Sequence, residues 1–364
     1  MHSNMNANEV IANKAIEIAG GKTLNKNPIL PIEDINKSQS INDIFSTVIH
    51  IAAAMELKNE LYPAVKKLRN SLDNKANEFK FILKVGRTHS MDSFLLTFGD
   101  EFSGYVNQLD NDLKRIDIVL NELLELAFGG TIIGTDRITI HKDFSKKVIK
   151  ELYKLTKIPF KATKNKFAAL SSKDALVFAH SELKTLATSL YKIANDLKVL
   201  ASGPRCGIGE LILPECDTID PIMPGKNNPV HCEIVSMVCS QVFGNDYTIT
   251  FAASQGHLEL NTFKPVIIYN FIQSSRLLTD VCNMFEKLCI KGIKINRVNT
   301  QAHINNTMVT VKALIPQIGE DKTTLIANKA MKNNISIKEA AITLGILNED
   351  EYDRLTFPSK LIKK

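Results

Sequence analysis

Apolar residues recur at three- and four-residue spacing along most of the chain, which is the period of a helix that buries one face. Residues 99–128 show it well, and their stripe consists of Phe102, Tyr105, Leu109, Leu113, Ile116, Val119, Leu123 and Leu124. Patterns of period two are scarce, so strands find little support. The spacing predicts an all-α chain with helices at residues 8–19, 46–56, 57–82, 99–128, 144–155, 171–201, 230–253 and 265–290.

Several of the predicted helices are unusually long. They run for about 25 to 30 residues, more than twice the mean of globular proteins. Such helices are typical of a long bundle, and of an oligomer in which neighbouring copies bury the apolar stripes. The tail changes to shorter helices at residues 308–318, 321–333 and 336–344, which predicts a small separate helical domain.

The composition is ordinary for a soluble globular protein. Of 364 residues, 44% are hydrophobic and 23% are charged. No apolar run approaches the length that spans a bilayer, and the first residues, MHSNMNANEV, lack the basic and apolar regions of a signal peptide. A cytoplasmic protein with no membrane partner is therefore expected.

Charge and cysteine usage exclude two further classes. The formal net charge of +6 comes from lysines scattered among carboxylates, so no nucleic-acid partner is predicted. The six cysteines form no Cys-x-x-Cys pair and have no histidine at zinc-finger spacing. We therefore predict buried thiols and no metal site.

One stretch, residues 213–246, joins a proline-containing loop to an apolar helix. Its prolines and glycine cannot all lie inside a helix, whereas the residues from Val230 onward have helical spacing. Lys226 therefore lies on a turn beside a helix start, next to Asn227 and Asn228. Backbone N–H groups at such a start attract anions, so this stretch is a candidate anion site.

Two polar loops between the predicted helices are further candidates. In residues 36–43, Ser40 or Asn42 can cap the helix that follows, which is a structural alternative to a functional role. In residues 86–92, GRTHSMD, the single histidine can be a structural residue. The polar neighbours of His89 also make it a candidate acid or base.

Two glycine-containing turns lack the features of nucleotide sites. Residues 129–135, GGTIIGT, have the glycine spacing of a phosphate loop, but Thr135 stands where a lysine is required. Residues 203–209, GPRCGIG, have the wrong spacing for a dinucleotide loop. Both are interpreted as tight turns between helices.

Three segments resemble the class II fumarases of the fumarase/aspartase superfamily. They are GRTHSMD at residues 86–92, ASGPRCGIGEL at residues 201–211, and IMPGKNNPVHCE followed by QVFGND up to Asp246. Tracts such as DINKSQSIND and IKEAAITLG are also similar, so the resemblance covers essentially the whole chain. It implies an all-α fold of the L-aspartase/fumarase type, a long-helix bundle with a small C-terminal helical domain. It also implies a homotetramer whose active sites are assembled from three subunits.

The resemblance also implies how the chain is divided. Residues 1–39 correspond to a remnant of the N-terminal domain, residues 40–297 to the central bundle and residues 298–364 to the C-terminal domain. The similarity begins inside the family's Gly-Ser-Gly-Thr-x-Ser-Asn-Met-Asn motif, at residues 3–6. Most of the N-terminal domain, with its substrate-contacting Ser and Thr, is therefore expected to be missing.

In such enzymes water adds reversibly to fumarate and gives (S)-malate, a step of the tricarboxylic acid cycle for which no cofactor or metal is expected. A base must remove a weakly acidic proton next to a carboxylate, and cations and hydrogen-bond donors must stabilise the anion that forms. By matched position, His89 with Glu233 of another subunit would orient or activate the water. The residues implied to bind the dicarboxylate are Lys226, Asn228, Thr88, Ser40 and Asn42.

The chain departs from the family at catalytic positions. Family members carry Gly-Ser-Ser before Ile-Met-Pro-Gly-Lys, and Asp220 replaces the first serine, the usual base, with Pro221 after it. A carboxylate can act as a base, but it would also repel a dianionic substrate, and the proline stiffens the loop. Ile41 replaces the second serine of the family's Ser-Ser-Asn. Residues 134–138 lose the family's asparagine, and residues 30–33 replace its secondary-site His-Pro-Asn-Asp.

Two hypotheses of different class follow. The first is a fumarate hydratase, impaired in this chain, that works with an altered base or with a separately encoded N-terminal fragment. The second is a catalytically inactive fumarase-like subunit with a structural role in oligomers. An aspartase-type ammonia-lyase is a third alternative. Turnover of fumarate distinguishes the first hypothesis from the second.

Overall fold

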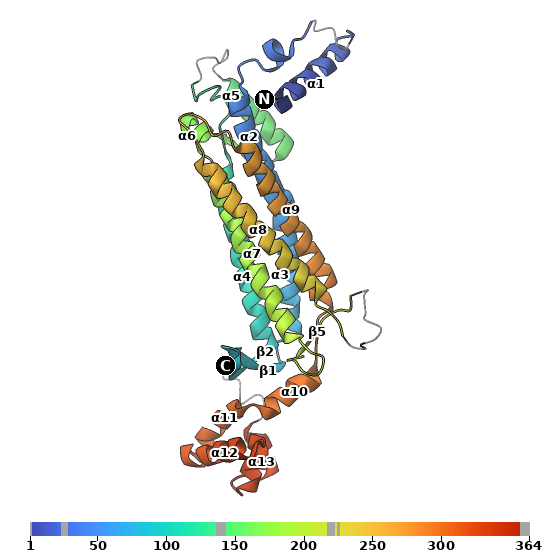
Figure 1. The fold of residues 1–364 in the computed structure, drawn as a ribbon, viewed down its shortest axis with the longest axis vertical. Coiled ribbons are helices and arrows are strands. Elements are labelled where there is room, and N and C mark those ends of the chain that lie inside the picture. The colour runs from blue at the N-terminus through green and yellow to red at the C-terminus, as the bar shows by residue number, and fades with distance from the viewer. Residues whose placement is uncertain (1, 23–27, 136–142, 217–222, 224–225, 357–364) are drawn as a thin grey trace. The chain divides into compact units, whose positions relative to one another are not determined.

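The computed structural model describes residues 2–22, 28–135, 143–216, 223 and 226–356. These residues are helical for most of their length (Figure 1), so the predicted all-α class is confirmed. The chain divides into two compact units. Unit 1 contains residues 1–66, 111–190 and 237–282, and unit 2 contains residues 67–110, 191–236 and 283–364. The division at residues 39 and 297 stays a prediction.

Five long helices contribute residues to both units. They are α3 (Tyr62–Glu78), α4 (Phe98–Leu123), α7 (Asp174–Leu200), α8 (Val230–Ser254) and α9 (Lys264–Leu288). The predicted stripe of α4 is buried from Phe102 to Leu123. α8 begins at the residue where the sequence predicts a helix start. α4 ends at Leu123 and not at residue 128, because the next residues leave the helix and pair with another strand.

Unit 1 otherwise contains short helices and one strand pair. Its helical elements are α1 (His2–Ile18), η1 (Pro31–Ile35), α2 (Ile41–Met55), η2 (Glu56–Leu61), α5 (Phe144–Thr156) and α6 (Lys166–Ser171). The two-residue strands β3 (Glu125–Leu126) and β4 (Lys161–Ala162) pair in parallel. Residues 41–78 stay helical through η2, across the boundary between the predicted helices at residues 46–56 and 57–82. Pro63 lies in the first turn of α3, where its missing N–H is tolerated.

Unit 2 contains two antiparallel strand pairs and the C-terminal helices. β1 (Leu83–Thr88) pairs with β2 (Met91–Thr97), and β5 (Leu211–Ile212) pairs with β6 (Lys294–Ile295). The helical elements are η3 (Ile290–Gly292), α10 (Arg297–Asn306), η4 (Met308–Thr310), α11 (Val311–Ile318), α12 (Glu320–Asn333), α13 (Ile337–Thr343) and α14 (Glu349–Leu355). α11 to α14 bury an apolar cluster of Leu314, Ile326, Ala330, Ile337, Ala340, Ala341, Leu347 and Tyr352.

The β1–β2 hairpin corrects the expectation of a loop between helices at residues 86–92. Gly86, Arg87 and Thr88 belong to β1, and β2 begins at Met91. The first four residues of β1 are all buried. Because buried and exposed positions do not alternate there, the strand lacks the pattern of period two by which strands are recognised.

The cysteine prediction is correct for four residues and wrong for two. Cys232, Cys239, Cys282 and Cys289 are buried free thiols. Cys206 is exposed and Cys216 is half-buried, because both lie in the segment between α7 and α8 and not on the buried face of a helix. All six are unbridged.

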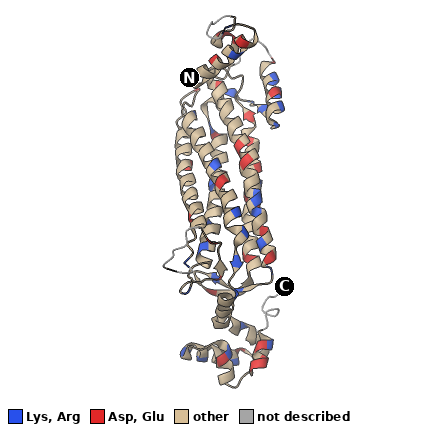
Figure 2. Cartoon of the chain, turned by 90° about the vertical axis from the view of Figure 1, so that its right-hand side faces the viewer, with Lys and Arg blue, Asp and Glu red and all other residues tan. Residues whose placement is uncertain are grey.

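Charge and hydropathy of the described residues add two observations. None of their helices is both long enough and apolar enough to cross a membrane, and nowhere among them do three His, Cys, Asp or Glu side chains gather as metal ligands would. On the face that Figure 2 shows, Lys and Arg lie interspersed with Asp and Glu along the helices. The net charge of +6 is therefore not concentrated in one basic patch on that face.

Candidate functional site

His89 and Ser90 form the two-residue turn at the tip of the β1–β2 hairpin, between the paired residues Thr88 and Met91. Their φ angles are 55° and 63°. Asn-Gly pairs normally supply this geometry, because other side chains disfavour positive φ. The side chains of Thr88 and His89 are exposed. Backbone strain of this kind concentrates at functional positions, which keeps His89 a candidate.

Below the turn, Arg87 forms a two-pronged ion pair with Glu210, which precedes β5. Arg87 Nη2 lies 2.7 Å from Glu210 Oε1, and Nη1 lies 3.0 Å from Oε2. Burial by itself would raise the pKa of Glu210, but hydrogen bonds from Arg87 and His303 and the charge of Lys84 hold that pKa below its usual value. Glu210 is thus a charged, fully buried partner of Arg87.

Lys226 and Asn228 lie on the segment that leads into α8. Lys226 N donates to the carbonyl of Met223 at 3.1 Å, so Lys226 lies on a turn, as the sequence predicts. Both side chains are exposed. Glu233 is also exposed and lies in the first turn of α8. A cation, an amide and a carboxylate therefore lie at one helix start, where the helix dipole favours anions.

Five exposed polar side chains of unit 2 have no side-chain partner among the described residues. Thr88, His89, Lys226, Asn228 and Glu233 form no side-chain hydrogen bond or ion pair with any other residue in the described ranges. Exposed groups of this kind are free to bind a ligand or another subunit. Among the described residues of this unit, nothing gives them a structural role, except that an acidic residue such as Glu233 suits a first helical turn.

Ser40 and Asn42 lie in unit 1 at the start of α2. Ser40 is the N-cap, so the structural interpretation of this loop is confirmed: its Oγ accepts from the N–H of Asn42 at 3.3 Å. Asn42 Nδ2 donates to the carbonyl of Ile132 at 2.9 Å. The side chain of Asn42 thus reaches the turn at residues 129–135. The sequence indicates that this turn is not a nucleotide site.

Asp43 supports the same turn and was missed by sequence reasoning. Its Oδ2 accepts from the N–H groups of Gly129 and Thr131, both at 3.0 Å, and its Oδ1 accepts from Ser40 N at 2.9 Å. Burial raises the pKa of Asp43, although these hydrogen bonds act in the other direction. The Ser-x-x-Asp spacing of a capping box could have identified it.

Several predicted positions lie outside the described residues. They are Asp220 with Pro221, and residues 136–138. Of the other departures from the family, Ile41 is the first residue of α2, and Pro31, Ile32 and Glu33 belong to η1. The role of Asp220 as a base therefore stays a prediction.

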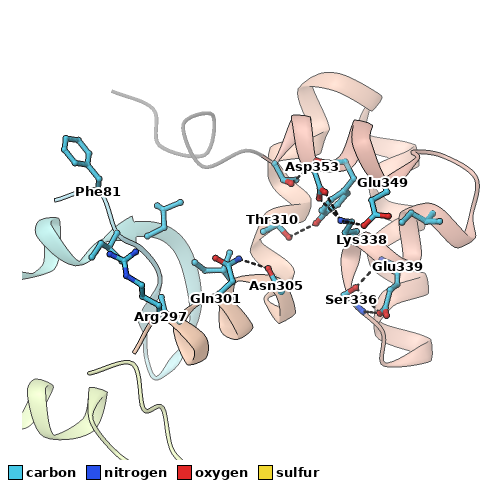
Figure 3. A pocket seen from close by; sticks show the side chains of 17 residues that line it. Phe81, Arg297, Gln301, Asn305, Thr310, Ser336, Lys338, Glu339, Glu349 and Asp353 are labelled. Carbon is cyan, nitrogen blue, oxygen red and sulfur yellow. Dashed lines mark hydrogen bonds and ion pairs between the residues drawn. The ribbon is translucent and has the colours of Figure 1, made fainter. Parts of the chain in front are cut away.

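Unit 2 also contains a cavity of about 710 Å³ that none of the predicted site residues lines. Figure 3 shows that its polar side chains interact with one another. Lys338 Nζ lies 2.8 Å from both Glu349 Oε1 and Asp353 Oδ1. Gln301 Nε2 donates to Asn305 Oδ1 at 2.8 Å. A ligand would have to replace these contacts, so we do not treat the cavity as a second candidate site.

Unit 1 holds a buried carboxyl pair away from the predicted site residues. Burial, together with the charge of Asp112, raises the pKa of Glu182 to about 8. Asp112 Oδ1 pairs with Arg115 Nη1 at 2.6 Å, while Asp112 Oδ2 and Glu182 Oε1 have no partner in the described structure. Glu182 is therefore protonated at neutral pH.

Known proteins resemble the chain along its whole length. Residues 1–244 match the Lyase family, and residues 308–363 match the family Fumarase C C-terminus. The fumarate hydratase class II of Chlamydia pneumoniae is 49% identical over 360 residues, which are 99% of this chain and 78% of that protein.

Two solved structures have the same fold. The class II fumarase of Schistosoma mansoni superposes with a TM-score of 0.90 at 36% identity, over 98% of this chain and 77% of that one. The fumarate lyase:delta crystallin of Brucella melitensis gives a TM-score of 0.94 at 37% identity, over 100% of this chain and 78% of that one. The chain therefore belongs to the class II fumarases of the fumarase/aspartase superfamily.

Proposed function

We propose that this chain is a subunit of a fumarate hydratase, which adds water reversibly to fumarate and gives (S)-malate. The observation that carries the proposal is a set of exposed side chains, around the start of α8 and at the tip of the hairpin, that have no side-chain partner among the described residues. Lys226, Asn228 and Glu233 supply the cation, the donor and the carboxylate that this reaction needs. Thr88 and His89 supply a further donor and an imidazole.

In the malate-to-fumarate direction, a base takes a proton from the carbon next to one carboxylate. The electron pair left behind spreads into that carboxylate, which then carries two negative charges. Lys226 and Asn228, beside the start of α8, suit this anion, because preorganised donors stabilise charge where it develops. The hydroxyl group then leaves the adjacent carbon as water. Asp220 occupies the base position in the sequence, and its carboxylate can accept the proton.

His89, paired with Glu233 of another subunit, would activate the water. The imidazole can accept a proton from the attacking water during hydration and return it to the leaving hydroxyl in the reverse reaction. A neighbouring carboxylate orients the ring and stabilises its charged form. Because neither side chain has a partner in the described structure, both remain available for this intersubunit pair.

Apolar side chains on α8 support the homotetramer. Phe243, Tyr247 and Phe251 follow one another at four-residue spacing and are 38%, 76% and 56% exposed. A stripe of aromatic residues on one helix face is typical of a subunit interface. A second copy of the chain would cover it and bring two sets of site residues together. The comparisons lend no support to a separately encoded N-terminal fragment.

The runner-up is an inactive fumarase-like subunit that keeps the bundle and its oligomer contacts. The Asp220-Pro221 replacement favours it, since a carboxylate there would repel a dianionic substrate. A hydratase with impaired turnover is intermediate between the two candidates, and the Asp220-Pro221 replacement would also explain it. Ile41 also favours the inactive subunit, because it supplies no hydrogen bond where the family has a serine.

Loss of the ultraviolet absorbance of fumarate separates the candidates. The test compares purified 1–364 with Lys226→Ala, after circular dichroism has shown that both are folded. Turnover above that of Lys226→Ala supports the hydratase, and equal rates support the inactive subunit. Reverting Asp220 and Pro221 to serine should raise the rate if these two residues impair it.

A further inference from the structure

The His89–Ser90 turn depends on the strands beneath it. Both residues have positive φ although neither is glycine, so the turn is not a conformation that the local sequence prefers. The contacts that hold the end of β1 and the start of β2 therefore determine where the His89 side chain points.

At the end of β1, Arg87 is held by Glu210, and His303 of α10 contacts the same carboxylate. His303 Nδ1 lies 2.9 Å from Glu210 Oε1, the oxygen that also accepts from Arg87 Nη2 at 2.7 Å. A carboxylate oxygen only accepts, so Nδ1 carries the proton in this contact. Because Glu210 has no exposed surface, its oxygens depend on these protein donors.

At the start of β2, Asp92 is held by the same helix. Thr307 Oγ1 donates to Asp92 Oδ2 at 2.9 Å. Thr307 is the C-cap of α10, and its N–H donates to the carbonyl of His303, one helical turn earlier, at 2.9 Å. Arg87 and Asp92 are register partners in the hairpin. α10 therefore contacts both strands at the same level, directly beneath the turn.

We propose that α10 is the positioning element of His89, with His303 acting through Glu210 and Arg87 on β1 and Thr307 acting through Asp92 on β2. Neither His303 nor Thr307 belongs to the residues proposed to bind substrate. The inference rests on the proposed function in one respect, since His89 needs a fixed direction only if it acts on the water. The support of the hairpin itself can be measured without any turnover.

The first experiment is hydrogen–deuterium exchange of the full-length protein, followed by mass spectrometry of peptides covering residues 83–97. Thr307→Val and His303→Leu should each speed exchange of the hairpin amides roughly five- to tenfold, because each removes one supporting hydrogen bond. Thr307→Ser and His303→Asn, which keep a hydroxyl and an amide donor, should restore slow exchange. Val298→Ala, an exposed position on α10, is the control.

The second experiment measures fumarate hydration by the same variants. A misdirected His89 should lower kcat roughly ten- to hundredfold with KM within about twofold, because His89 serves the water and does not hold the substrate carboxylates. Asp92→Ala should match Thr307→Val, and the double variant should be no worse than either single one, since both remove the same contact.

The outcomes are decisive in each case. Unchanged hairpin exchange in a folded Thr307→Val protein overturns the proposal, as does faster exchange with unchanged kcat in an active enzyme. If the parent protein has no turnover, the proposed function fails, and the exchange of the hairpin alone then decides whether α10 supports it. If His303→Leu fails to fold, hairpin exchange in the isosteric Thr307→Val variant decides whether the proposal holds.

Discussion

The side-chain amide of Asn227 donates a hydrogen bond of 3.0 Å to the carbonyl oxygen of Pro214. A second bond, 3.1 Å long, runs from the same nitrogen to the carbonyl of Leu213, and Asn227 Oδ1 accepts from Cys216 N at 3.4 Å. One side chain therefore connects the residues that follow β5 with those that precede α8, directly beside Lys226.

We expect Asn227→Ala to weaken both the fold and substrate binding. The change leaves two carbonyls without their donor, which should cost about 1–2 kcal/mol of unfolding free energy. Because Lys226 and Asn228 flank this residue, KM for fumarate should rise roughly fivefold with a smaller change in kcat. Urea unfolding and initial rates measure both effects. Asn74→Ala, at an exposed position of α3, is the control, and an unaltered KM in Asn227→Ala would contradict the expectation.

Asp43→Ala should be among the most destabilising substitutions of unit 1. It removes the acceptor of three N–H groups, those of Ser40, Gly129 and Thr131, and the unfolding free energy should fall by about 3–5 kcal/mol. Asp43→Asn keeps one acceptor and should lose less. Denaturant unfolding of both variants at one protein concentration checks the order, and a loss below about 1 kcal/mol for alanine would refute it.

Glu182 should make the protein less stable as the pH rises. Its pKa is raised from 4.5 to about 8, first by burial and then by Asp112. Between these values the folded state keeps the proton and the unfolded state releases it. The free energy of unfolding should therefore fall by about 1.4 kcal/mol per pH unit across this window because of this group.

Glu182→Gln provides the matched comparison, because glutamine has nearly the same shape and stays neutral. Urea unfolding of the parent and of this variant from about pH 5 to about pH 8 should show a difference in slope. Stability curves that run parallel over this range would show that Glu182 does not titrate as described.

Tyr247→Asp should dissociate the oligomer. The substitution places a charge in the exposed aromatic stripe of α8, and burying an unpaired carboxylate in an interface is costly. Light scattering after size exclusion should show a smaller particle than the parent. Val298→Asp, at an exposed position of α10, should leave the mass unchanged. An unchanged mass for Tyr247→Asp would show that this stripe is not part of the interface.

Mixing two inactive variants should restore activity if the site is shared between subunits. His89→Asn and Glu233→Gln should each lose most of the turnover. Subunits that are unfolded together and refolded at equal amounts should recover about a quarter of the parental activity, because an intact pair then forms at random. Mixtures as inactive as their components would place both residues in one subunit or outside the site.

Short-range features of this protein could be derived from the sequence. The apolar period located the long helices, and the change from prolines to helical spacing located the start of α8 at Val230. The cap at Ser40 and the turn at Lys226 were also expected. In each case the interactions join residues a few positions apart, so the local sequence contains both partners.

Tertiary structure decided the features that depend on distant partners. Arg87 and His303 are 216 positions apart, and Asp92 and Thr307 are 215 apart, so no local pattern could place α10 beside the hairpin. The hairpin itself escaped detection because β1 is buried without alternation. The sequence by itself thus determined the helices and the exposed polar groups of the candidate site. Folding determined what holds His89, because long-range contacts form only when remote segments pack together.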